Sequence, residues 1–165
     1  MATGTYQGAE LENAEIKVLE EIEAILKKPI PKRESSETKI DFGFIAEKNH
    51  VKILALAKAR MSKLPEKIGV LSEVEELNLS DNLLDSLPTT IGNLGKNLIR
   101  LDLWGNKLSS KSFSAEMANL YNLHFLELGG NSALKKEAKT YGAYWENSHK
   151  TKGDVRALIS KFRRI

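Results

Sequence analysis

One pattern of leucines recurs along the middle of the chain at nearly constant spacing. Its clearest copy reads Val74-Glu75-Glu76-Leu77-Asn78-Leu79-Ser80-Asp81-Asn82-Leu83-Leu84. Two more copies begin at Leu98 and Leu123, and a weaker one begins at Val51. These starts at 51, 74, 98 and 123 lie 23, 24 and 25 residues apart. A period of this length indicates small units that cannot bury their apolar faces alone and must stack on one another.

The period and the pattern L-x-x-L-x-L-x-x-N are typical of leucine-rich repeats. The alternating L-x-L has the period of a strand, which excludes chance amphipathic helices and predicts paired leucines that point into the core. These are the leucines at 54 and 56, 77 and 79, 101 and 103, and 126 and 128. An asparagine ends the strand in three copies (Asn82, Asn106 and Asn131), where its amide can satisfy unpaired backbone groups. Ala59 leaves the first copy without this residue.

The second half of each unit is expected to form the side of the array opposite the strands. Leu-Pro at 64–65 and 87–88 predicts a bend in the chain. Ile-Gly at 68–69 and 91–92 predicts an apolar side chain that anchors this side of the array, followed by a flexible glycine that ends the segment. The third unit instead predicts a short helix after Ser114, with Met117 and Leu120 turned inward.

We therefore expect an α/β fold, a short leucine-rich-repeat solenoid of about four repeats with a parallel concave sheet, over residues 51–131. Residues 1–50 are expected to form an N-terminal cap, with a helix over about 9–28 and a strand over about 40–46 that makes a β-hairpin with the first repeat strand. Apolar residues spaced by three and four, and the prolines at 29 and 31, predict that helix. Residues 132–165 are expected to form a C-terminal helical cap.

The chain resembles small intracellular leucine-rich-repeat proteins of prokaryotes and the repeat arrays of Roco-type GTPase proteins. Three segments carry the resemblance: Phe42-Gly43-Phe44 with Asn49-His50-Val51, the Leu-Pro-x-x-Ile-Gly-x-Leu unit, and Gly153-Asp154-Val155-Arg156-Ala157-Leu158. The resemblance implies a role in signalling and a small GTPase as one possible class of partner. It does not imply GTP hydrolysis, because the sequence has no G-x-x-x-x-G-K-[ST] fingerprint.

The amino-acid composition indicates in which compartment the protein works and which class of partner it binds. The chain has no cysteine, whereas extracellular repeat proteins usually carry disulfide-bonded caps, so we expect a cytoplasmic protein. No run approaches the ~20 apolar residues that span a bilayer. The net charge of +3 is too small to favour nucleic-acid binding. Residues 132–165, however, carry nine basic and three acidic groups.

The polar residues do not favour catalysis. Without cysteine there is no thiol nucleophile, and the three histidines, at 50, 124 and 149, are scattered. On a strand His124 and Glu127 would point to opposite faces. We therefore expect no enzyme activity, no cofactor and no metal site.

We predict a non-catalytic protein–protein interaction module that binds a partner on the concave face. The positions between the core leucines face that surface, and Trp104 stands out because its column neighbours are small. The predicted partner-binding residues are Glu76, Asn78, Ser80, Asp81, Arg100, Asp102, Trp104, Phe125 and Glu127.

Three alternatives remain open at this stage. Trp104 would be structural if it lay flat across Gly129 or Ser80, and Arg100 would be a solvated charge if it paired with Asp102 and Glu127. The basic C-terminal segment would allow electrostatic binding of nucleic acid or an anionic membrane. The concave face would be idle if the chain served only as a folding or oligomerisation unit.

Overall fold

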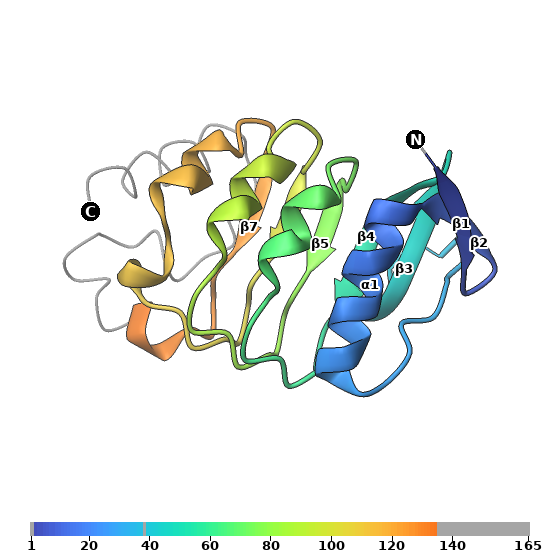
Figure 1. Cartoon of the computed structure of the whole chain (residues 1–165). Helices are drawn as coiled ribbons and strands as arrows, with labels where there is room; N and C mark the ends of the chain where they lie inside the picture. Colours follow the sequence, from blue (N-terminus) through green and yellow to red (C-terminus); the bar gives the residue numbers. More distant parts are fainter. Residues whose placement is uncertain (1, 38, 135–165) are drawn as a thin grey trace.

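The computed structural model describes residues 2–37 and 39–134, and its centre is one open sheet of five strands (Figure 1). The strand order follows the chain, β3-β4-β5-β6-β7. The first pair is antiparallel and the strands from β4 onward are parallel. The strands are β3 (Phe42–Glu47), β4 (His50–Leu56), β5 (Glu76–Asn78), β6 (Arg100–Asp102) and β7 (Phe125–Glu127).

The predicted leucine pairs form the core on one face of this sheet. All eight, from Leu54 to Leu128, are no more than 1% exposed. Short 3-10 helices cover them from the other side, because the Leu-Pro and Ile-Gly segments turn the chain back over the leucines (Figure 1). These helices are η1 (Glu66–Val70), η2 (Thr89–Leu94), η3 (Ser110–Ser112) and η4 (Ala115–Asn119). The inward positions predicted for Met117 and Leu120 are confirmed.

The register confirms the predicted columns across the other face. Ile53, Glu76, Arg100 and Phe125 are successive partners in one column. Ala55, Asn78, Asp102 and Glu127 are successive partners in the next. Because side chains alternate along a strand, both columns point away from the leucines.

The predicted asparagines make a buried ladder at the carboxyl ends of the strands. Asn106 donates through Nδ2 to the carbonyls of Leu79 (2.9 Å) and Leu103 (3.0 Å), and its Oδ1 accepts the amide of Leu84 (3.0 Å). Asn82 and Asn131 make equivalent bonds. Each amide therefore joins one turn to the turn before it, as predicted.

The glycines on the helical side serve close packing rather than the flexibility we expected. A Cβ on Gly92 would lie 2.5 Å from the carbonyl oxygen of Glu116, and one on Gly95 would lie 1.7 Å from that of Asn119. Adjacent 3-10 helices therefore touch through backbone atoms. A side chain at either position would force η2 and η4 apart.

The N-terminal region contains a β-hairpin that was not predicted, and its second strand occupies the first residues of the expected helix. The helix α1 spans Asn13–Leu26 rather than 9–28, and strands β1 (Thr3–Tyr6) and β2 (Ala9–Glu12) precede it. Gln7 and Gly8 both have positive φ, as a tight two-residue turn requires. Lys27, in a left-handed conformation, ends α1 before Pro29. The helix packs on the same side of the sheet as the 3-10 helices (Figure 1).

An antiparallel hairpin of β3 and β4 stands where residues 40–46 and the first repeat strand were expected to pair, but β3 begins at Phe42, so Ile40 and Asp41 belong to the preceding loop. The loop before it does more than connect elements. Lys32 pairs with Phe44, and the amide of Ala57 donates to the carbonyl of Asp41 (2.8 Å). Ile40 is 8% exposed and packs with Ile45 and Ala55 on the face opposite the leucines. The loop 32–41 therefore crosses the start of that face.

The sheet is open and does not curl into the horseshoe that the term concave implies. Curvature accumulates by a small rotation per repeat, and four parallel strands among the described residues make a short array. The expected C-terminal cap lies, from residue 135 on, outside the described residues. In the part of the chain that the structure describes, no helix is both long enough and apolar enough to cross a membrane.

Candidate partner-binding face

We use the name open face for the side of the sheet that points away from the leucine core. The register brings all six strand residues of the predicted site to it. The other three lie two or three residues beyond the ends of β5 and β6, and we include them in the face as predicted members. Its members are Glu76, Asn78, Ser80, Asp81, Arg100, Asp102, Trp104, Phe125 and Glu127. The sequence therefore predicted which residues share this surface, while their use by a partner stays a prediction.

The backbone of Trp104 is fixed from three directions. Its amide donates to Oδ1 of Asp102 (3.0 Å). Its carbonyl accepts the amide of Asp81 (2.8 Å) and Nδ2 of Asn106 (3.3 Å). Two of these partners belong to the open face and the third belongs to the buried ladder. The position of the tryptophan therefore depends on the repeat architecture itself.

The indole ring of Trp104 lies against the next turn. A Cβ on Gly129 would lie 2.8 Å from Cδ1 and 2.9 Å from Nε1 of the ring, and one on Gly130 would lie 3.1 Å from Cε2. Only glycine at 129 lets the ring approach this closely. Trp104 nevertheless remains 45% exposed. The ring therefore lies against Gly129, as the structural alternative for Trp104 supposed, and the rest of the side chain faces solvent.

We expect Gly129→Ala to lift the ring of Trp104 off this support with less than about 1 kcal/mol of destabilisation, because the clash is with a side chain that can rotate away. Acrylamide quenching of fluorescence, measured in a Trp145→Phe background so that Trp104 is the only tryptophan, should rise in the variant. Unchanged quenching would contradict the placement of the ring.

Arg100 takes part in two contacts within the open face. Its guanidinium carbon lies 4.7 Å from the centre of the Phe125 ring, and its Nε lies 3.8 Å from Oε2 of Glu76. Both side chains of the ion pair are about half exposed, so the pair contributes little to stability. One alternative supposed that Arg100 pairs with Asp102. Among the described residues, the ion pair of Arg100 is instead with Glu76.

Asp102 is a carboxylate in an unfavourable setting. Burial raises the pKa of its carboxyl group above the ordinary value, and the nearby charges of Glu127 and Asp81 act in the same direction. The hydrogen bond from the Trp104 amide and the charge of Arg100 oppose this change without cancelling it. Asn78 holds Ser80 in the same way as Asp102 holds Trp104, since its Oδ1 accepts the amide (3.0 Å) and the hydroxyl (2.7 Å) of Ser80.

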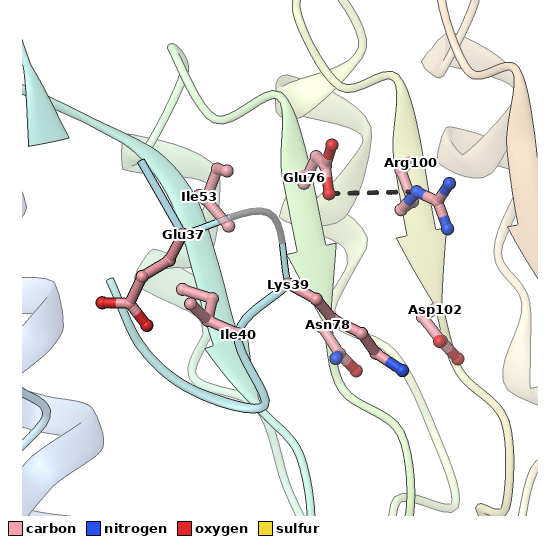
Figure 2. A pocket seen from close by; sticks show the side chains of 8 residues that line it. All are labelled: Glu37, Lys39, Ile40, Ile53, Glu76, Asn78, Arg100 and Asp102. Atoms are coloured by element: carbon pink, nitrogen blue, oxygen red, sulfur yellow. Dashed lines mark ion pairs between the residues drawn. The ribbon is translucent and has the colours of Figure 1, made fainter. Parts of the chain in front are cut away.

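A cavity of about 370 Å³ lies between the loop 32–41 and the open face (Figure 2). Four predicted site residues line it from the sheet: Glu76, Asn78, Arg100 and Asp102. Ile53 adds an apolar patch from β4, and the loop supplies Glu37, Lys39 and Ile40. Sequence reasoning missed these loop residues. The isolated Ile40 beside Asp41 was the one available sign that this polar segment packs on the sheet.

His50 contacts a buried carboxylate on α1, Glu15. His50 Nδ1 is 3.0 Å from Oε1 of Glu15, which is 1% exposed and accepts the Val51 amide through Oε2 (2.8 Å). His124 Nδ1 is 2.7 Å from the carbonyl oxygen of Asn122. Within residues 2–37 and 39–134, no group of three or more histidine, aspartate or glutamate side chains is placed to hold a metal ion.

Comparison with known proteins agrees with the repeat geometry. The leucine-rich repeat family model matches residues 73–94, which contain the whole of β5 and of η2. No curated protein matches the chain. The prediction of a leucine-rich repeat protein is confirmed, while the resemblance to Roco-type arrays stays a prediction. Leucine-rich repeats generally mediate protein–protein interactions, and the family is typically non-catalytic.

Proposed function

We propose that this leucine-rich repeat protein binds a partner protein on the open face, with Trp104 as the main anchor, and catalyses no reaction of its own. The observation that carries the proposal is the setting of Trp104. The side chain is 45% exposed, while its backbone makes three hydrogen bonds and its ring rests on Gly129. An exposed aromatic side chain that is already ordered loses little conformational entropy on binding, which favours affinity.

The neighbours of Trp104 support the same proposal. Arg100 and Phe125 add a cation and a second aromatic ring to the same face, in the column beyond Asp102 and Glu127. Tryptophan and arginine are enriched among the residues that contribute most to protein interfaces. The cavity beside Asp102 offers a recess for a partner side chain. An anchor, a mixed polar rim and a recess are the parts of a typical binding patch.

Finer parts of the proposal depend on the sequence. We propose that the four strand-and-turn units act as a short solenoid, and that the N-terminal elements and residues 132–165 cover its two ends. The partner is a cytoplasmic signalling protein, of which a small GTPase is one class. The cysteine-free composition supports the compartment, and only the resemblance supports the partner class.

We expect Trp104→Ala to weaken capture of the partner from a native cell extract about 30-fold, equivalent to about 2 kcal/mol, because the anchor is removed. The matched control is Tyr121→Ala, which removes an aromatic side chain that is 49% exposed in the turn before β7. Circular dichroism would confirm that both variants fold. Equal capture by wild type and Trp104→Ala would contradict the proposal, and a partner released only by salt would favour the basic residues beyond 134.

A further inference from the structure

The charge on the open face is unevenly distributed. Four of its nine members are acidic, and Arg100 is the basic one. Arg100 lies toward Glu76 and Phe125, in the column farther from Trp104. Among the described residues, no ion pair joins Asp81 or Asp102 to a basic side chain. Of the nine members, those nearest Trp104 that carry a charge are therefore acidic, while Lys58 and Lys39 lie at the border of the face.

Asp81 and Asp102 lie on either side of the Trp104 backbone. Asp102 accepts its amide hydrogen, and the amide of Asp81 donates to its carbonyl. A Cβ on Gly105, the residue after Trp104, would lie 2.7 Å from Oδ1 of Asp81, so that carboxylate is held close to this turn. The two carboxylates therefore flank the turn that carries the exposed indole.

A carboxylate beside an exposed indole is a setting that favours a cationic side chain. The ring face attracts an ammonium or guanidinium group, and the attraction strengthens as water is excluded. A nearby carboxylate adds a charge-assisted hydrogen bond. The raised pKa of Asp102 has the same physical origin, because a partly buried negative charge among like charges is stabilised by an approaching cation.

The cavity indicates how the rest of a ligand would lie. Asp102 lines the cavity (Figure 2), and its carboxylate also accepts the Trp104 amide, so one carboxylate connects the cavity with the turn that carries Trp104. Ile40 and Ile53 give the cavity an apolar part, and the Lys39 side chain extends from the loop toward Asn78 and Asp102 while Glu37 points away (Figure 2). An extended segment that crossed the strands could place one side chain at Trp104 and a neighbouring one in the cavity.

We infer that the open face recognises a basic segment of the partner protein, and that one arginine or lysine of this segment binds against Trp104 between Asp81 and Asp102. The inference rests on the proposed function and adds the chemistry of the partner. Charge complementarity selects a basic protein segment over a nucleic acid or an anionic membrane, because the carboxylates of this face repel phosphate groups.

The test is to pan a phage-displayed library of random dodecapeptides on the full chain and to measure the affinity of synthetic copies of the enriched peptides. We expect arginine or lysine at one enriched position. Asp102→Asn should weaken binding roughly tenfold, because it removes the charge while its Oδ1 still accepts the Trp104 amide. Asp85→Asn, a matched change at an exposed aspartate outside the open face, should leave affinity unchanged.

The other outcomes separate the two proposals. Peptides without basic residues that still need Trp104 would overturn the inference and leave the proposed function standing. Failure to enrich any peptide that depends on Trp104 or Asp102 would overturn both. Displacement of the bound peptides by a synthetic copy of residues 148–165 would identify this chain's own basic segment as the occupant and would overturn the assignment to a partner protein.

Discussion

Asn106→Ala is expected to lower the free energy of unfolding by about 3 kcal/mol. The side chain is 5% exposed, and alanine cannot replace any of its hydrogen bonds. The carbonyls of Leu79 and Leu103 would lose a donor, and the amide of Leu84 would lose its acceptor. Each buried group left unpaired costs roughly 1–3 kcal/mol, and partial relaxation or entry of water offsets part of the sum.

Urea titration followed by circular dichroism measures this loss through the shift of the unfolding midpoint. The matched control is Asn119→Ala, since Asn119 is exposed on η4, and its effect should stay within about 0.5 kcal/mol. An equally small effect at Asn106 would mean that the asparagine ladder results from the strand arrangement and does not stabilise it. Such a result would also weaken the argument that the ladder fixes Trp104.

The repeat region was predictable because its period fixes both register and orientation. Once Leu77 and Leu79 point inward, Glu76 and Asn78 must point outward, and the same holds in each neighbouring strand. The columns that contain Arg100 and Asp102 therefore followed from the sequence and match the observed strand partners. Asn106 followed for the same reason, since the pattern places it where strands end.

Elements outside the period were predicted less well. The hairpin of β1 and β2 was missed because Ala9, Leu11 and Glu12 also suit the start of the helix that follows. The Gln7-Gly8 turn and the buried Tyr6 decide in favour of strands. Ile40 was predicted to begin the strand over about 40–46, whereas in the structure it precedes β3 and packs on the open face through a tertiary contact. Such contacts have no periodic signal.

The position of Glu15 on the apolar face of α1 is a sequence signal for a buried carboxylate. Glu15 lies three, four and seven residues before Val18, Leu19 and Ile22, which are fully buried, so it shares their helical face. A carboxylate on such a face needs buried partners. The structure supplies them from the start of β4, in the amide of Val51 and the ring of His50.

The buried carboxylate leads to a pH-dependent prediction. Burial raises the pKa of Glu15 above its ordinary value, although the contacts with His50 and the Val51 amide act in the opposite direction. The native state therefore holds this proton more tightly than the unfolded chain does. The resulting stabilisation is complete below the ordinary pKa of a glutamate and is lost as the pH rises through the raised value.

Glu15→Gln removes the titration and keeps a side-chain oxygen that can accept the Val51 amide. We expect the free energy of unfolding of the wild type, minus that of the variant, to decrease as the pH rises from 4 toward neutrality. Its slope cannot exceed about 1.4 kcal/mol per pH unit, because one proton is involved. Urea titrations at several pH values would measure it. A difference that increases with pH would mean that His50 and the Val51 amide outweigh burial, so that Glu15 would stabilise the junction of α1 and β4 as a carboxylate.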